Sequence, residues 1–392
     1  MQSQPNSDAG ALELNSRRLR VLFLAPSLAK LGGQAIQCSK LMAKLETEPS
    51  LQVDFIPHDP RMPRGFNWTQ RIKYLRTIVT TSLYWSLLLT RAWRYDILHI
   101  FSASYYSYLL SVAPAIIIGR LYGKKVILNY RSGEAEDHLE NWKLSGVPTA
   151  RLAHVIVVPS GYLVEVFAKF GLKAQAIYNI VDLERFSYRE RKSLRPVFLT
   201  SRLFEPLYNV GCVLRAFALI QQRFPNASLT VAGDGWMRDE LEQLSRDLGL
   251  RQTEFVGRVA FEDTPAMYDQ ADIYLNGTNL DNMPSSITEC MASGLPVVTT
   301  NAGGIPFIVT HEESCLMVEC NDHEAMAAAA IRLLEDNALA LKLASHSRLA
   351  AKKFTWPVVR DEWVSLYHEL VAESIVSGKS ALHLDEVSPT PR

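Results

Sequence analysis

The stretch Asp281–Gly304, DNMPSSITECMASGLPVVTTNAGG, predicts a helix, a buried strand and a glycine loop in direct succession. Residues 284–286 suit a helix N-terminus, because proline fits the first turn and serine caps free backbone N–H groups. Gly294 is a favourable helix end. The β-branched run 295–299 predicts a buried strand, and the glycine pair 303–304 lets the backbone approach a ligand closely.

Two carboxylates flank the start of this helix. Asp281 lies in the loop before it, and Glu289 lies about a turn inside it. A helix N-terminus offers unpaired N–H groups and a partial positive charge, which suit a diphosphate. Carboxylates do not hold phosphate, but they accept hydrogen bonds from vicinal hydroxyls. The arrangement predicts a site for a diphosphate attached to sugars. The alternative is a loop aspartate and a solvated helical glutamate.

The same stretch resembles the donor-site motif of the family 4 retaining glycosyltransferases of the GT-B fold. In that motif a carboxylate, usually Glu, stands ahead of a second Glu in EAMA-G-PVV, and a GG-P loop follows. Asp281 and Glu289 occupy the two acidic positions, and residues 290–300 and 303–306 match the remainder. Phe307 departs from the family, which often has Glu after that proline.

Composition describes an ordinary globular protein. A chain of 392 residues is long enough for two domains, each with its own core. The net charge of +0 implies no general affinity for nucleic acid. The charge is uneven, however, because residues 1–190 carry 23 of the 41 Lys and Arg but 15 of the 41 Asp and Glu. A basic first half and an acidic second half suit different partners.

The cysteines and the apolar runs bear on location. The five cysteines are scattered and form no CxxC pair, so neither a disulfide framework nor a zinc site is indicated. Residues 1–16 are polar, so no signal peptide is expected. No apolar run reaches about 18 residues, the length that a spanning helix needs. These features favour the cytoplasm.

The first domain opens with a predicted strand at 19–25, a loop that ends in Gly32-Gly33, and a helix at 34–45. Strand, glycine loop and helix is the plan of a phosphate-approaching turn in a parallel sheet, although a bare glycine pair is weak evidence. Its position resembles the family's acceptor-side glycine loop, which implies that Gly33 lets the backbone approach the reaction centre.

Residues 60–95 contain no Asp or Glu but seven basic residues, interleaved with aromatic ones. The apolar part, 78–89, is too short to span a bilayer. Such a segment is typical of an amphipathic surface on anionic lipid, which predicts peripheral contact through 61–94 with the inner face of the cytoplasmic membrane. The alternative is a pair of core helices with solvated basic ends.

Arg131 follows a predicted strand at 125–130, where relatives carry a His that faces the donor sugar. Arg131 takes that position, His138 lies further along, and a guanidinium suits contact with phosphate. His99 lies inside a predicted strand, 96–101, and is expected to be a satisfied core residue.

The second domain opens with a predicted strand at 197–201, followed by Arg202, in a segment that resembles the family's GRL…KG…L..AF. Arg202 matches the donor-phosphate Arg of the family. The accompanying Lys is missing, and Tyr208 lies in its neighbourhood. Diphosphate binding then requires a substitute from Arg131, Tyr208 or a backbone group.

Two further turns resemble the family. Gly233 opens a GDG turn after a predicted strand. Arg258 and Val259 end another predicted strand, at the place where relatives touch the nucleotide base.

Alternating short strands and helices favour two doubly wound, Rossmann-like α/β domains facing a cleft. The resemblance implies the GT-B fold, with a C-terminal helix crossing back to the first domain. The predicted divisions are a disordered N-terminus 1–16, an acceptor domain 17–190, a donor domain 191–355, the returning helix 356–376 and a disordered tail 377–392. The polar stretch 184–196 is the expected linker, and a helix at 105–121 is expected to be interrupted at Pro114.

The resemblance implies a retaining glycosyltransferase. It would move a sugar from a nucleotide-sugar donor to a glycan, lipid-linked or small acceptor in cell-surface polysaccharide synthesis, with no metal or other cofactor. One alternative is an inactive GT-B protein that binds nucleotide sugar as a sensor or partner subunit, because the Lys is missing. Another is a GT-B phosphorylase or epimerase, but no lysine has a credible context for pyridoxal phosphate, and epimerases lack the acidic pair.

The implied catalytic residues are Arg202, Glu289 and Asp281. Arg202 neutralises the departing diphosphate, Glu289 holds ribose hydroxyls, and Asp281 holds donor-sugar hydroxyls. The implied donor-binding residues are Gly33, Arg131, Tyr208, Gly233, Arg258, Val259, Asn282, Met283, Pro284, Ser285, Ser286, Gly303 and Gly304.

Overall fold

The computed structural model describes residues 17–27, 33–62, 72–102 and 104–384, which divide into two compact units. The first unit comprises the described residues up to 158, residues 166–177 and those from 360 onward. The second unit comprises residues 159–165 and 178–359. The predicted disordered N-terminus, 1–16, lies outside the described residues.

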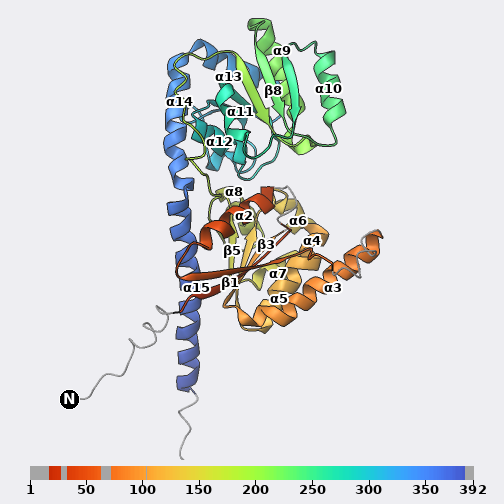
Figure 1. The fold of residues 1–392 in the computed structure, drawn as a ribbon, viewed down its shortest axis with the longest axis vertical. Helices are drawn as coiled ribbons and strands as arrows, with labels where there is room; N and C mark the ends of the chain where they lie inside the picture. Colours follow the sequence, from red (N-terminus) through yellow and green to blue (C-terminus); the bar gives the residue numbers. More distant parts are fainter. Residues whose placement is uncertain (1–16, 28–32, 63–71, 103, 385–392) are drawn as a thin grey trace, which may run out of the picture. The chain divides into compact units, whose positions relative to one another are not determined.

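Six parallel strands form the sheet of the first unit, in the order β2-β1-β3-β4-β5-β6 (Figure 1). They are β1 (Leu19–Ala25), β2 (Leu51–Pro57), β3 (Ile97–Ser102), β4 (Lys125–Tyr130), β5 (Val155–Val158) and β6 (Ala174–Ala176). The inner strands β3 and β4 are almost wholly buried, as expected for apolar runs in a parallel sheet. The predicted α/β architecture is confirmed for this unit.

The helical segment from Tyr105 to Leu121 runs without a break, so the predicted interruption at Pro114 is wrong. A π-helical turn at Tyr108–Val112 precedes α5, and Pro114 stands in the first turn of α5. The π-helical turn changes the backbone hydrogen-bond pattern just before the proline that lacks an N–H, so the helical segment continues through Pro114. The helical elements of this unit are α2 (Gly33–Leu45), α3 (Lys73–Arg91), η2 (Ala92–Arg94), α4 (Tyr105–Ser107), η3 (Tyr108–Val112), α5 (Ala113–Leu121), α6 (Ala135–Asn141), α7 (Gly146–Arg151) and part of α8 (Gly161–Lys169).

The final helix, α15 (Trp356–Leu384), extends past the predicted end at 376, so residues 377–384 are helical rather than part of a disordered tail. From residue 360 it belongs to the first unit. There Arg360 donates to both carboxylate oxygens of Glu48, at 2.6 and 2.7 Å. Trp363 is fully buried, and its ring centroid lies 4.6 Å from that of His99.

Six parallel strands also form the sheet of the second unit, in the order β12-β11-β10-β7-β8-β9. They are β7 (Val197–Ser201), β8 (Ser228–Ala232), β9 (Thr253–Gly257), β10 (Ile273–Asn276), β11 (Val297–Thr300) and β12 (Leu316–Val318). The strand order reverses between β7 and β10. Ligands of open α/β sheets bind at the carboxyl ends of strands flanking such a reversal.

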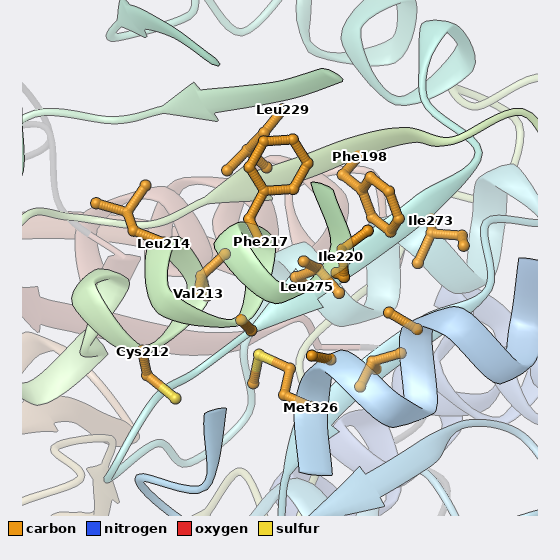
Figure 2. Packing of buried hydrophobic residues seen from close by; sticks show 14 of the residues in the cluster. Phe198, Cys212, Val213, Leu214, Phe217, Ile220, Leu229, Ile273, Leu275 and Met326 are labelled. Atoms are coloured by element: carbon orange, nitrogen blue, oxygen red, sulfur yellow. The ribbon is translucent and has the colours of Figure 1, made fainter. Parts of the chain in front are cut away.

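Two apolar cores cover the two faces of this second sheet. Successive strand residues alternate between them: Phe198 belongs to one core and Leu199 to the other. Figure 2 shows the first core, where Phe217 and Ile220 of α9 pack near Phe198. The helical elements are η4 (Pro206–Tyr208), α9 (Val210–Arg223), α10 (Arg238–Asp247), α11 (Thr264–Gln270), α12 (Ser285–Ser293), η5 (Ile305–Phe307), α13 (His323–Glu335), α14 (Asn337–Ala350) and η6 (Ala351–Phe354).

Residues 178–190, which the sequence analysis counted with the first domain, group with the second unit. The Val181 N–H donates to the Phe354 carbonyl at 2.9 Å. The predicted linker, 184–196, is also fixed to the second unit, because Arg189, Arg191 and Arg195 all contact the Asp272 carboxylate. These three arginines of the predicted linker therefore pair with a buried carboxylate instead of being only solvated.

Acid is expected to destabilise the first unit. Burial lowers the pKa of His58 to about 4 and that of His99 well below its usual value. Because the unfolded chain takes up protons near pH 6.5 and the native state does not, stability falls as pH drops through that range. Each histidine contributes a loss of about 1.4 kcal/mol by pH 5.5.

The measurement is the melting temperature between pH 8 and 5. It should be constant above pH 7.5 and fall below 6.5. The His58 ring packs edge-on against Tyr84, with 5.4 Å between the ring centroids. His58→Phe keeps an aromatic ring there and removes the contribution of His58 to the fall of the melting temperature with pH. A slope unchanged in His58→Phe would contradict this account.

Candidate functional site

Arg202 and Asp281 come together where the second sheet reverses its strand order. Arg202 follows β7 directly, and Asp281 lies in the loop after β10. Their side chains form an ion pair from Arg202 Nη2 to Asp281 Oδ2, with exposed fractions of 9% and 14%. Parallel strands carry their carboxyl ends to one edge, so two residues far apart in sequence meet there.

The Arg202 guanidinium is held on three sides. Besides Asp281, it donates from Nη1 to Ser286 Oγ at 3.2 Å, and its Cζ lies 4.2 Å from the centre of the Tyr208 ring. Burial alone would lower the pKa of Arg202, but the Asp281 charge raises it, so the group stays cationic. Within the described part of the chain, its buried Nε–H has no hydrogen-bond partner. This cation therefore keeps a spare donor.

The α12 helix begins beside this arginine. The predicted start of this helix, with a proline in the first turn and a serine cap, is wrong in detail: Pro284 is itself the N-cap residue, and no side chain caps the helix. Ser286 accepts from Arg202 instead of capping. Within the helix, Glu289 is half-buried and near Tyr268; burial first, and then the Glu289 charge, raise the pKa of that phenol well above its usual value.

The glycine pair 303–304 packs directly on the loop that carries Asp281. A Cβ on Gly303 would lie 2.2 Å from the Asp281 carbonyl oxygen, and one on Gly304 would lie 1.9 Å from that of Asn282. Gly303 also has φ of +52°, which favours glycine. The Gly304 N–H donates to the Asp281 carbonyl at 2.8 Å. Loop packing is thus a sufficient reason for both glycines.

Gly304→Ala is expected to lower the free energy of unfolding by about 1–3 kcal/mol, because the new Cβ meets backbone that cannot rotate away. The control is Gly211→Ala in α9, whose Cβ would make an ordinary 3.4 Å contact with Leu244. In that variant the free energy of unfolding should rise by up to about 1 kcal/mol, because alanine has the higher helix propensity. Thermal melting measures the stability of both variants, and an unchanged melting temperature in Gly304→Ala would contradict the packing.

Two residues outside the predicted site contact the loop between β10 and α12, which carries Asp281. Ser160 donates to Asn282 Oδ1, and Asn179 donates from its backbone N–H to Met283 Sδ at 3.1 Å. Asn282 and Met283 are each only 6% exposed. Ser160 and Asn179 are not among the predicted site residues, because no local pattern encodes contacts that span 122 and 104 residues of sequence.

The GDG turn supports the loop that bears Arg202. Gly233 has φ of +135°, and a Cβ there would lie 1.8 Å from the Arg202 carbonyl oxygen. Beside it, Asp234 pairs with the half-exposed Arg258 at 3.3 Å. Val259 packs against the second core. Three of the predicted donor-binding positions thus lie at the carboxyl ends of β8, which pairs with β7, and of β9, which pairs with β8.

The remaining predicted site residues, Gly33 and Arg131, belong to the first unit. Gly33 is the first residue of α2, and Gly32 lies outside the described residues. Arg131 follows β4 and donates from Nε to Asn129 Oδ1 at 2.8 Å. His138 is fully buried, and its Nδ1 lies 2.9 Å from the Tyr130 hydroxyl.

The first unit also carries an exposed apolar face on α3 and α5. Tyr122 of α5 donates to the Leu89 carbonyl of α3, so the two helices are adjacent (Figure 1). The large apolar side chains exposed on α3, η2 and α5 are Tyr74, Ile78, Trp85, Leu89, Trp93, Ile117 and Leu121. We call these residues the α3–α5 face. Arg76, Arg91 and Arg94 are exposed on the same elements, while part of the predicted basic segment, 63–71, lies outside the described residues.

Among the helices of the described residues, none is both long and apolar enough to cross a bilayer.

Two parallel six-stranded sheets, one with a buried cation at its point of reversal, define a two-domain α/β protein of the GT-B fold. Residues 183–352 match the family model for glycosyl transferases group 1. The second unit is thus similar to the glycosyl transferases group 1 family over most of its length, and assignment of the chain to family 4 in particular stays a prediction.

Three similar proteins cover different parts of the chain. Over 150 residues, 38% of this chain and 43% of the other, it is 31% identical to the lipopolysaccharide core biosynthesis glycosyltransferase LpsD of Rhizobium meliloti (strain 1021). It is also 26% identical to glycogen synthase of Mycobacterium tuberculosis over 297 residues, which are 71% of this chain and 69% of the synthase. The crystal structure of Anabaena HepE in complex with UDP and glucose superposes with a TM-score of 0.68 at 18% sequence identity. The superposition covers 89% of this chain and 99% of the HepE chain. The chain thus spans less than half the length of LpsD.

Proposed function

We propose that the protein is a retaining glycosyltransferase that moves a sugar from a nucleotide-sugar donor to an acceptor. The observation that carries the proposal is the buried Arg202 cation, with its spare Nε–H, beside the uncapped N-terminus of α12. A buried guanidinium and a helix N-terminus together suit a diphosphate. HepE, a structural neighbour, was solved with UDP and glucose, which supports a donor of this class.

In this proposal the bond between the anomeric carbon and the diphosphate oxygen breaks, and negative charge develops on the diphosphate. Arg202 and the α12 N–H groups stabilise that charge without reorganising. Asp281 accepts hydrogen bonds from the donor sugar, and Glu289 from the ribose. Arg131 is the proposed phosphate contact of the first unit. The acceptor attacks the face from which the diphosphate leaves, and the diphosphate takes up its proton, so no metal and no separate protein base is required.

The acceptor is proposed to be a lipid-linked or cell-surface glycan at the inner face of the cytoplasmic membrane. The α3–α5 face combines exposed aromatic and aliphatic side chains with arginines, which suits anionic lipid. LpsD, named for lipopolysaccharide core biosynthesis, supports an acceptor of this kind.

Ile78→Glu is expected to weaken vesicle binding strongly, because it replaces an apolar side chain that is 62% exposed in the α3–α5 face with a charge that anionic lipid repels. The measurement is co-sedimentation with phosphatidylcholine vesicles with and without phosphatidylglycerol. Leu144→Glu is the control, since Leu144 is 96% exposed in the turn between α6 and α7. Equal losses in the two variants, or binding independent of phosphatidylglycerol, would contradict the proposed face.

The test of the function is a thermal-shift screen with UDP, GDP, ADP and their common sugar conjugates, followed by donor hydrolysis and transfer assays. A ligand that binds only the native state raises the free energy of unfolding by RT ln(1 + [L]/Kd), and the melting temperature rises with it. Stabilisation by one nucleotide and release of that nucleotide from its sugar conjugate would support the enzyme, and the anomeric configuration of the product tests retention. Binding without turnover would favour the sensor, a role that the absence of the family's Lys also suggests.

A further inference from the structure

A chain of hydrogen bonds crosses the core of the first unit from α15 to the end of β4. The Tyr367 hydroxyl lies 2.7 Å from His99 Nδ1, and Asn129 Nδ2 lies 2.8 Å from His99 Nε2. Arg131 then donates from Nε to Asn129 Oδ1 at 2.8 Å. Tyr367, His99 and Asn129 are each 0% exposed. No solvent therefore substitutes for a lost partner along this chain.

The chemistry of Arg131 fixes the direction of every bond in the chain. A guanidinium has donors only, so it requires the oxygen of the Asn129 amide. The amide nitrogen then faces His99 and donates to Nε2, which makes Nε2 an acceptor. In a neutral imidazole the proton is then on Nδ1, from which His99 donates to the Tyr367 hydroxyl oxygen.

His99 has little freedom to change its ring position. Its ring centroid lies 4.3 Å from that of Phe23 and 4.6 Å from that of Trp363. Burial also lowers the pKa of His99 well below its usual value, which agrees with a neutral ring. At the other end, the Arg131 guanidinium lies over the Phe101 ring at 5.3 Å.

We infer that Tyr367 is a positioning residue for Arg131, acting through the tautomer of His99 and the orientation of the Asn129 amide. The inference rests on the proposed function, in which Arg131 contacts substrate. If the hydroxyl is removed, the buried Nδ1–H of His99 loses its acceptor, and the Nε2–H tautomer becomes competitive. In that tautomer the Nε2–H donor of His99 faces the NH2 donor of Asn129. The Asn129 amide then rotates by 180°, which directs its oxygen to His99 and its NH2 group to Arg131 Nε–H. Two donors then face each other, and Arg131 leaves its position.

The direct test is NMR of the full chain labelled with 15N-histidine and 15N-arginine. We expect wild-type His99 as the Nδ1–H tautomer and a slowly exchanging Arg131 Nε–H. Tyr367→Phe should raise that exchange rate about fivefold, the effect of losing one buried hydrogen bond. Tyr84→Phe is the matched control, because Tyr84 is 1% exposed in the same unit and donates to the Ser111 carbonyl at 3.3 Å. An Nε2–H tautomer in the wild type, or equal acceleration in both variants, overturns the inference.

Kinetics give a second and separate test. Tyr367→Phe should lower kcat about fivefold with little change in the donor KM, and the effect should vanish in an Arg131→Ala background. Additive effects of the two substitutions would overturn the positioning role. If the wild type transfers no sugar, the proposed function fails, while the NMR outcomes still decide whether Tyr367 positions Arg131.

Discussion

Arg202→Ala is expected to lower kcat/KM for glycosyl transfer by about 100- to 1000-fold, the usual effect of removing one group that stabilises developing charge. Arg202 is the cation that the described structure holds at the reversal of the second sheet, and the family's accompanying Lys is missing. The same variant should lose the thermal stabilisation by nucleoside diphosphate. Both assays together separate a binding defect from a catalytic one.

The Asp281 carboxylate complicates this variant, since it would lose its partner at 14% exposure. Arg202→Ala combined with Asp281→Asn removes the unpaired charge, so the pair of variants distinguishes loss of the cation from local disorder. Arg202→Lys keeps the charge but not the planar fork that reaches Ser286 and Asp281 together, so a partial loss is expected. Arg223→Ala is the control, because Arg223 is 67% exposed and pairs with Glu335 on the surface. Full activity of Arg202→Ala would remove the central support for the donor site.

Asp272→Ala is expected to destabilise the second unit by about 3–5 kcal/mol, the cost of breaking a buried ion cluster from one side. The Asp272 side chain is 0% exposed, and it accepts from Arg189 at 2.6 Å and from Arg195 at 2.9 Å. Arg191, itself only 1% exposed, would keep a buried charge without this carboxylate. Chemical denaturation monitored by circular dichroism measures the change.

Asp269→Ala is the matched control. Asp269 is 53% exposed and pairs with Arg189 at 3.0 Å, so a loss below about 1 kcal/mol is expected. The arginines also hold the pKa of Asp272 below its usual value despite its burial. A carboxyl group with a depressed native pKa contributes stability above its unfolded pKa and loses it as pH falls. The difference between Asp272→Ala and wild type should therefore shrink in acid, and equal effects of the two alanine variants would contradict the cluster.

The sheets were predictable because their signals are local. Runs such as Leu19–Ala25 and Val197–Ser201 are mostly apolar, and each is an inner strand of a parallel sheet. The short helices α6 and α7 were not predicted, since few residues give little periodicity. The predicted break at Pro114 was wrong because a preceding π-helical turn is not visible in sequence.

The candidate site was predictable to the extent that it follows the strand ends. Arg202 and Asp281 were singled out by resemblance, and the strand order explains why they meet. Their direct pairing was not predicted, because the sequence analysis assigned Asp281 to a sugar and Arg202 to a phosphate. The Ser160 contact with Asn282 spans 122 residues of sequence, and no local pattern encodes it. The Tyr208 stacking was also beyond prediction, since an inserted aromatic ring has many possible neighbours.

The Asp272 cluster determines how the protein can be dissected. A fragment of the second unit that begins at Val197, where its first strand starts, would lack all three arginines and leave a buried carboxylate without counter-ions. One that begins at residue 178 would keep the arginines and the Val181 hydrogen bond to Phe354. Limited proteolysis should accordingly cut poorly between 184 and 196, even though the sequence there is as polar as an interdomain tether.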